Sequence, residues 1–244
     1  MRRAIGYIFT PFFYLAFGLV LLIMHPVQVI CRRLGGYQCH KRSVDFVSLF
    51  LNRSLWVMGA RISFRGVSDL PLDRPLIVVA NHQSTYDIPA IGWRFRKHHP
   101  KFISKIELGK GIPSISYNLR HSGSALIDRK NGPQSIREIF KLGKLIEEKN
   151  YAACIFPEGT RSRNGNVKKF QAGGLRTLLK AAPSAIIVPF AIQGHYELQK
   201  GGKFPLPFGE KLTYTTLDPI EPADFTPEEL VVKAEEAIKK ALGQ

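Results

Sequence analysis

The chain has 244 residues and a formal net charge of +16, from 35 Lys and Arg against 19 Asp and Glu. So basic a balance suits nucleic acid, an anionic membrane or acidic soluble partners. The three cysteines show no C-x-x-C spacing, which argues against a disulfide framework and predicts reduced thiols in a cytosol-facing protein. No H-E-x-x-H, GxGxxG, P-loop or G-x-S-x-G motif occurs, so we expect neither a metal nor a bound cofactor.

The N-terminal segment is apolar. Ala4 to Met24 carries no charge and is long enough to span a bilayer, and Pro11 and Pro26 are positions where it could bend. Val44 to Ile62 is a second, amphipathic segment with apolar residues at helical spacing. We therefore predict that residues 1–60 form a two-helix membrane-binding segment sunk into one leaflet. The alternatives are a single span with a surface helix, or a second helix that packs on the globular domain.

Basic residues flank the first apolar segment on both sides. Arg2 and Arg3 precede it, and a heavier cluster follows, made of Arg32, Arg33, Lys41 and Arg42. Because cytoplasmic flanks are enriched in Lys and Arg, both ends are expected on the cytoplasmic side. The sequence thus predicts a cell-membrane protein whose following domain, residues 61–244, lies at the cytoplasmic face.

Residues 61–244 alternate between strand and helix patterns. Strands are predicted at 62–65, 75–80, 101–104, 124–127, 152–156, 186–192 and 211–217. We expect Pro189 to interrupt the sixth of these and the seventh to be an edge strand. Helices are predicted after Asp87, from Pro133, over 175–182 and from the Thr226 capping box. The alternation indicates an α/β fold with a mixed, mostly parallel sheet flanked by helices.

The chain is organised around the end of the strand at 75–80. His82 follows this strand directly, and Asp87 lies in the first turn of the helix behind it. Ligands of open α/β sheets bind at the carboxyl ends of strands. A histidine held there by a carboxylate is a candidate catalytic base, with His82 and Asp87 as the catalytic residues. The alternative is that Ser84-x-x-Asp87 is only a helix capping box.

Polar clusters end three further predicted strands, and parallel strands would bring them to the same edge as His82. Gly159 permits close backbone approach to a ligand, and Arg161 offers a planar fork for a phosphate. The candidate substrate-binding residues are Lys105, Arg129, Glu158, Gly159, Thr160 and Arg161. They predict a pocket for an anionic head group, although solvated surface cations are the usual fate of single basic residues.

Four blocks in this order resemble the glycerolipid acyltransferase family. They are Asn81–Asp87, which fits N-H-x4-D, Gly123–Arg129, which ends in I-D-R, Phe156–Ser162, which reads F-P-E-G-T-R-S, and the pair Val188-Pro189. The sequence departs from the family at Ser114–Tyr117, where a glycine-aromatic turn is common, and at Gln171, where lysine is common.

The resemblance implies an O-acyltransferase that moves a fatty acyl group from acyl-CoA or acyl carrier protein to the sn-2 hydroxyl of 1-acyl-glycerol 3-phosphate. His82 would remove the hydroxyl proton, Asp87 would hold the imidazole, and backbone N–H groups near the helix start would stabilise the oxyanion. The implied partners are lysophosphatidic acid, the acyl donor and membrane lipids. We expect Lys97, His98, His99 and Lys101 to form a docking patch for the donor.

Other functions stay open at this point. The same chemistry could use glycerol 3-phosphate, another lysophospholipid or a lyso-ornithine lipid as the acceptor. The His82–Asp87 pair could also act on water, as in a thioester hydrolase, and a non-catalytic lipid-binding protein is a third class. Nucleic acid is not an expected partner, because the aromatic residues concentrate in the N-terminal apolar segments rather than among the basic clusters.

Overall fold

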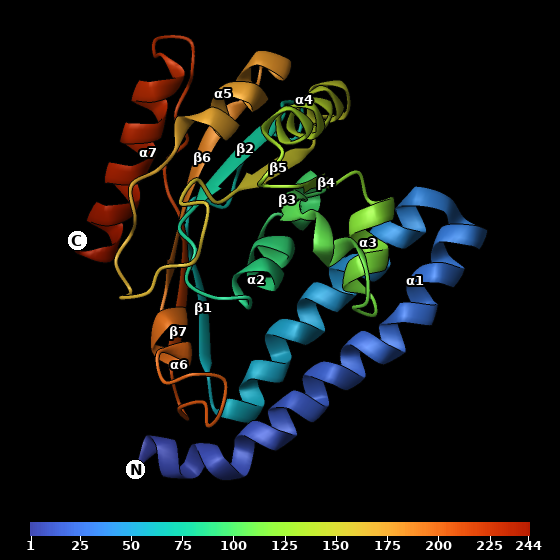
Figure 1. Cartoon of the computed structure of the whole chain (residues 1–244), viewed down its shortest axis with the longest axis vertical. Coiled ribbons are helices and arrows are strands. Elements are labelled where there is room, and N and C mark those ends of the chain that lie inside the picture. The colour runs from blue at the N-terminus through green and yellow to red at the C-terminus, as the bar shows by residue number, and fades with distance from the viewer.

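The computed structural model describes all 244 residues (Figure 1). Its strands are β1 (Arg61–Gly66), β2 (Leu76–Ala80), β3 (Lys101–Lys105), β4 (Ala125–Ile127), β5 (Ala152–Ile155), β6 (Ile186–Gln193) and β7 (Lys211–Thr216). Its α-helices are α1 (Arg2–Ser54), α2 (Asp87–Arg94), α3 (Ile115–His121), α4 (Gly132–Lys149), α5 (Ala172–Ala181), α6 (His195–Gln199) and α7 (Pro227–Leu242). Short 3₁₀ helices occupy Leu55–Met58, Arg96–His98 and Ile106–Gly109.

The strands form one sheet in the order β1-β7-β6-β2-β5-β3-β4. Neighbouring strands are parallel throughout, except that β6 and β7 are antiparallel. The predicted mixed, mostly parallel sheet is therefore confirmed. The carboxyl ends of β2, β3, β4 and β5 point the same way, which brings the loops that follow them to one edge.

Helices cover both faces of the sheet. Alternate residues of β2 serve opposite sides: Val78 belongs to the core under α1 and α2, whereas Ile77 and Val79 belong to the core under α4, α5 and α7. All five residues of β2 are buried, as expected for a central strand of a parallel sheet. Figure 1 shows α7, α5 and α4 on one side, with α1 and α2 on the other.

Two predictions about the C-terminal strands are wrong. β7 is not an edge strand, because β1 pairs with it in parallel register from Arg61 opposite Lys211 onward. Pro189 does not interrupt β6, since it stays in register with Val79 of β2. The carbonyl of Pro189 accepts a hydrogen bond from Leu217 N at 3.0 Å, so its nitrogen faces the chain that leaves β7. The missing N–H therefore removes no bond from the β2 ladder.

The N-terminal 54 residues form a helical hairpin. α1 continues past both Pro11 and Pro26, and the chain reverses at Gly36, whose φ of 63° and ψ of −153° are not helical. Figure 1 shows the two arms of α1 running in opposite directions beside the sheet domain. The second arm ends at Ser54, earlier than predicted, because a 3₁₀ turn and then β1 begin before Ile62.

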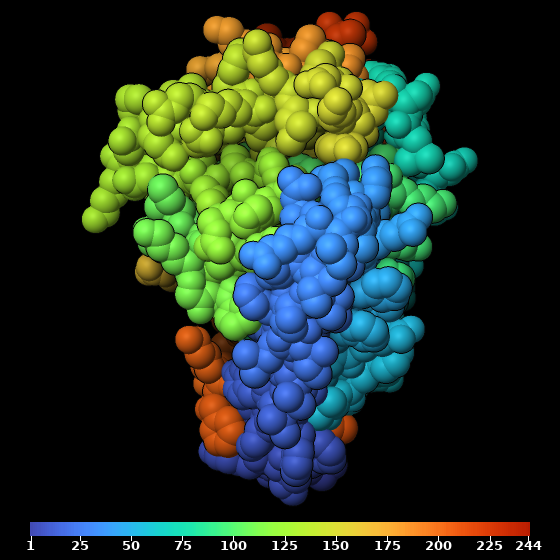
Figure 2. Space-filling model, turned by 90° about the vertical axis from the view of Figure 1, so that its right-hand side faces the viewer, coloured from blue at the N-terminus to red at the C-terminus, as the bar shows by residue number.

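The hairpin lies on the surface of the molecule (Figure 2), and its outer side is apolar and exposed. By length and composition, α1 is the one helix able to cross a membrane. Its large exposed apolar residues are Tyr7, Ile8, Phe9, Phe12, Leu15, Leu19, Leu22, Ile23, Val27, Ile30, Leu34, Phe46 and Phe50. A continuous apolar surface of this kind marks a protein or membrane contact.

The same hairpin also contributes to the core. Phe13 from the first arm, with Leu55 and Met58 after the second, lies fully buried in the cluster that contains Val78 and Tyr214. One side of the hairpin therefore packs on the globular domain, as the alternative prediction stated. The membrane-binding prediction concerns the opposite, exposed side. A boundary at residue 60 stays a prediction, since both parts share this cluster.

Candidate active site

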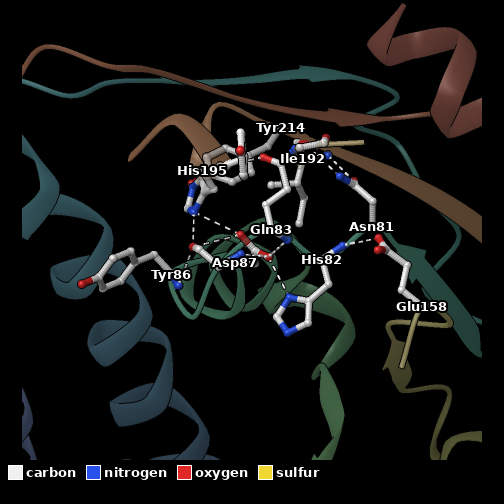
Figure 3. Close-up of polar contacts among 12 residues, drawn as sticks. Asn81, His82, Gln83, Tyr86, Asp87, Glu158, Ile192, His195 and Tyr214 are labelled. Atoms are coloured by element: carbon white, nitrogen blue, oxygen red, sulfur yellow. Dashed lines mark hydrogen bonds and ion pairs between the residues drawn. The ribbon is translucent and has the colours of Figure 1, made fainter. Parts of the chain in front are cut away.

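His82 and Asp87 are brought together at the end of β2. His82 Nδ1 lies 2.8 Å from Asp87 Oδ2, and the other ring nitrogen points away from the carboxylate (Figure 3). The ring stacks on Phe156, with 4.1 Å between ring centroids. His82 keeps 18% of its side-chain surface exposed, whereas Asp87 is fully buried. The free nitrogen of His82 is therefore the part of this pair that a substrate can reach.

The Asp87 carboxylate is saturated with hydrogen bonds. Oδ2 also accepts from Gln83 N at 2.7 Å and Ser84 N at 2.9 Å, and Oδ1 lies 3.0 Å from His195 Nδ1. Burial alone would raise the pKa of Asp87, but the hydrogen bonds from His195 and His82 outweigh it and hold the pKa well below its usual range. Of the capping-box interpretation only the contact from Ser84 N to Asp87 is present, because the N-cap of α2 is Tyr86 and no side chain caps the helix.

The backbone of His82 is fixed by the loop that follows β5. Glu158 Oε1 accepts from His82 N at 2.8 Å, and Ser162 N donates to His82 O at 2.8 Å. Asn81 is held in turn by β6: its side chain accepts from Ile192 N at 2.7 Å and donates to Ile192 O at 2.9 Å. Contacts from two neighbouring strands therefore leave this turn little freedom, as a preorganised catalytic group requires.

A cavity of about 1050 Å³ begins at His82. Three predicted cations line it where the strands end, namely Lys105 at the end of β3, Arg129 after β4 and Arg161 after β5. None of the three forms an ion pair with an acidic side chain of the protein, so their charge is available to an anionic ligand. The rest of the wall includes apolar residues from α1, α2 and α3, namely Val44, Val47, Leu51, Ile88, Ile115 and Leu119.

The comparisons with known proteins agree with this arrangement. The family described as Acyltransferase matches residues 61–193, more than half of the chain. This chain belongs to the acyltransferase family. The resemblance seen in the four sequence blocks is thereby confirmed, and the chain is an O-acyltransferase.

Individual relatives of this acyltransferase carry a more specific name. The 1-acyl-sn-glycerol-3-phosphate acyltransferase of Limnanthes douglasii is 27% identical over 214 residues, which are 86% of this chain and 70% of that protein. The alpha enzyme of Mus musculus is 25% identical over 92% of this chain and 77% of its own length. The crystal structure of the 1-acyl-sn-glycerophosphate acyltransferase PlsC of Thermotoga maritima matches with a TM-score of 0.79 at 26% identity, covering 100% of this chain and 97% of that one.

The predicted site residues of the acyltransferase do not all face the cavity. Gly159 and Thr160 line it together with the three cations. Gly159 has a φ of +69°, which favours glycine, and no neighbouring atom fills the space beside its Cα. Glu158 is not part of the lining; its carboxylate turns back to His82 N and, at 3.4 Å, to Lys168 N. Its position suits support of the turn rather than contact with a substrate.

Neither His195 nor Tyr214 was predicted from the sequence as a site residue. His195 is fully buried; its Nδ1 lies 2.7 Å from Ser84 Oγ as well as close to Asp87, and its Nε2 contacts the hydroxyl of Tyr214 (Figure 3). No local pattern marks either residue, because the pairing of β6 with β2 brings His195 to Asp87 and the pairing of β7 with β6 brings Tyr214 to His195. The one available signal was a histidine directly after a buried strand, in Gln193-Gly194-His195.

The expectation of a docking patch is wrong, and the expectation about backbone N–H groups is narrowed. Lys97 is exposed, but His98 and Lys101 are only 7% and 3% exposed, so these residues do not form the predicted docking patch. The N–H groups of Gln83 and Ser84, in the turn before α2, already donate to Asp87, so they are not free to bind an oxyanion. An oxyanion site near the helix start stays a prediction for the remaining N–H groups, such as that of Thr85, which lines the cavity.

Proposed function

We propose that this acyltransferase moves a fatty acyl group from an acyl thioester to the sn-2 hydroxyl of 1-acyl-glycerol 3-phosphate, giving phosphatidic acid. The donor is acyl-CoA or acyl carrier protein. The observation that carries the proposal is the position of the His82–Asp87 pair beside three cations without acidic partners, at the mouth of a partly apolar cavity. The names of the relatives, all 1-acyl-sn-glycerol-3-phosphate acyltransferases, support the same acceptor.

Each part of the reaction has a group suited to it. The free nitrogen of His82 takes the proton of the acceptor hydroxyl, whose oxygen attacks the thioester carbonyl carbon. Asp87 keeps the proton on Nδ1 and stabilises the imidazolium that forms. The C–S bond then breaks, and the proton passes from His82 to the departing thiolate. Catalysis of this kind needs no metal, cofactor or nucleophilic side chain.

The cations and the cavity would bind the two ends of the substrates. Lys105, Arg129 and Arg161 bind the phosphate of the acceptor, because charge-assisted hydrogen bonds to phosphate are strong where the cations lack other partners. The acyl chain extends into the apolar part of the cavity, which removes it from water. We assign the oxyanion to the N–H groups of Thr160 and Arg161, which have no acceptor within the protein.

The membrane-binding hairpin would place this site at the cytoplasmic face. Its exposed apolar residues lie in one leaflet, and the basic residues near its ends and its turn contact anionic head groups. A lysophospholipid acceptor stays in that leaflet, while a soluble donor approaches from the cytoplasm. Lyso-ornithine lipid and other lyso-acceptors remain the alternatives within the same chemistry.

The test is a thioester-release assay on the purified protein, with and without 1-acyl-glycerol 3-phosphate, in parallel with glycerol 3-phosphate and other lysolipids. We expect release that depends on the lysophosphatidate acceptor and yields phosphatidic acid. His82→Ala and Asp87→Asn should lower kcat by about 10²- to 10⁴-fold. His121→Ala, an exposed histidine of α3, is the matched control. Equal release of free fatty acid without an acceptor would instead identify a hydrolase.

A further inference from the structure

The cavity that begins at His82 is also lined by buried polar side chains. Gln28 and His40 are each 1% exposed and Lys101 is 3% exposed, yet all three belong to its wall. Gln28 lies on the first arm of α1, His40 on the second arm just after Gly36, and Lys101 at the start of β3. Asn118 of α3 lines the same cavity. We call Gln28, His40, Lys101 and Asn118 the inner polar cluster.

Three atoms of this cluster lack a hydrogen-bond partner. They are Gln28 Oε1, His40 Nε2 and Asn118 Oδ1. Buried polar side-chain atoms are nearly always paired, and an unpaired one is costly. All three belong to residues that line one cavity, and each atom itself is buried, so a small rotation of its side chain would bring it to a partner inside the cavity.

Lys101 is also short of partners. Its Nζ donates to Tyr37 Oη at 2.8 Å and lies 4.8 Å from the centre of that ring. No carboxylate pairs with it, because Asp45 is bound to Lys41 at 2.6 Å. An ammonium has three N–H donors, so two remain for a ligand. Burial lowers the pKa of Lys101 to about 7, consistent with a cation that lacks a counter-ion.

The strand register separates Lys101 of this cluster from the catalytic base. Lys101 pairs with Ala153, which pairs with Ile77 of β2, and His82 lies five residues beyond Ile77. At the usual rise of a strand this is about 16 Å. The wall between them includes apolar residues such as Val47 and Leu119. A molecule that reaches from His82 to the cluster must therefore be long, flexible and mostly apolar, with a polar group far from the reacting carbonyl.

We propose that the inner polar cluster binds a hydroxyl group carried by the acyl chain that occupies the cavity. A hydroxyl both donates and accepts, so it can donate to an unpaired amide oxygen of Gln28 or Asn118 and accept from Lys101 Nζ. A methyl group leaves all of these unpaired. A carboxylate would be attracted by Lys101 but repelled by the two amide oxygens and by the nearby Asp45. The inference rests on the proposed acyl transfer. The hydroxyl-bearing acyl chain belongs to the thioester donor or to the lysolipid acceptor.

The experiment measures kcat/KM of the full chain in lipid vesicles. One arm varies the donor, as hexadecanoyl thioesters with a hydroxyl placed mid-chain, near the end, at the end or absent. The other arm varies the same positions in the acyl chain of 1-acyl-glycerol 3-phosphate. An ω-carboxyl chain is included in both arms. The variants are Lys101→Met and Gln28→Leu, with Lys97→Met as the matched exposed control.

We expect one hydroxyl position in one arm to raise kcat/KM about tenfold over the plain chain. Lys101→Met and Gln28→Leu should each abolish this preference while turnover of the plain chain is kept or increased, and Lys97→Met should retain it. The arm that shows the effect identifies the source of the chain. Three results would overturn the proposal: no preference in either arm, a preference that survives both variants, or a stronger preference for the ω-carboxyl chain. The absence of any preference is expected if the cluster holds only water.

A binding measurement separates this inference from the proposed function. Thermal stabilisation of the purified protein by hydroxy-hexadecanoate, compared with plain hexadecanoate, needs no turnover. Selective stabilisation that is lost in Lys101→Met supports the cluster even if lysophosphatidate proves not to be the acceptor. Equal stabilisation by both fatty acids contradicts it even if lysophosphatidate is acylated. If Lys101→Met does not fold, Gln28→Leu and Asn118→Leu give the same decision.

Discussion

His195 Nδ1 lies 3.0 Å from Asp87 Oδ1, on the side of the carboxylate opposite to His82. Both partners are fully buried, so this contact is not exchanged with water. One aspartate is therefore held between two histidines, of which only His82 reaches the cavity. We regard His195 as a positioning residue that fixes the orientation of Asp87, and through it that of the His82 ring.

Replacing His195 tests this role. His195→Leu should lower kcat about 10- to 100-fold with little change in KM, because a hydrogen bond to a buried charge is lost. His195→Asn can still donate to Asp87 and should recover part of the loss. Tyr214→Phe keeps the ring and should have a smaller effect. A purely structural role predicts instead that Leu and Asn variants lose activity equally, in proportion to their lost thermal stability.

Arg161 provides a test of phosphate binding. Arg161→Met should raise KM for 1-acyl-glycerol 3-phosphate about tenfold and leave kcat within a few-fold, since the contact is made equally before and during reaction. Arg163→Met is the control, because Arg163 is exposed in the same loop but does not line the cavity. Equal KM values for the two variants would assign the phosphate contact to Lys105 and Arg129.

The raised pKa of Glu158 predicts that the stability of the fold depends on pH. Burial raises the pKa of Glu158 to about 6, against 4.5 for the free side chain, although hydrogen bonds from the His82 and Lys168 N–H groups oppose the shift. The folded state thus binds the proton more tightly than the unfolded chain. Proton binding by Glu158 therefore contributes at most about 2 kcal/mol to the free energy of unfolding. This contribution is complete below pH 4.5 and is lost as the pH rises through about 6.

Chemical denaturation in detergent between pH 4.5 and 7 measures this contribution. The wild-type free energy of unfolding should fall with rising pH relative to that of Glu158→Gln, which can still accept from His82 N but does not titrate. Parallel curves for the two proteins would show that Glu158 has the same pKa in the folded and unfolded states.

The exposed side of the hairpin gives a membrane prediction. Leu15 and Leu22 are 60% and 59% exposed, so Leu15→Glu and Leu22→Glu leave the core intact and place charge where lipid is expected. The double variant should float with anionic vesicles far less than the wild type. Val232→Glu, at a residue of α7 that is 52% exposed, is the control. Undiminished flotation of the double variant would mean that another surface binds the vesicles.

Local sequence signals predicted much of this structure. The Thr226 capping box and Pro227 start α7 as expected, because capping depends on residues only three positions apart. His82 and Asp87 were likewise identifiable, since a turn of five residues connects them. The ends of β3, β4 and β5 also meet at one edge, as parallel strands require.

Long-range pairings set the limits of the prediction. The edge-strand assignment for β7 failed because β1, 150 residues earlier in the chain, covers it. Lys101 was assigned to a surface patch, since nothing beside it in the sequence shows that Tyr37 of α1 covers it. His195 was missed for the same reason, as it lies 108 positions after Asp87.

The segment shared with the family ends at residue 193, two positions before His195 and well before Tyr214. A shortened enzyme cut at that limit would retain the complete pair that performs the chemistry. Yet one oxygen of its aspartate would face an empty space where an imidazole had been, with only the Ser84 hydroxyl left as its donor. Any attempt to miniaturise this catalyst, or to exchange its C-terminal quarter with that of a relative, must carry the tyrosine-bearing strand along.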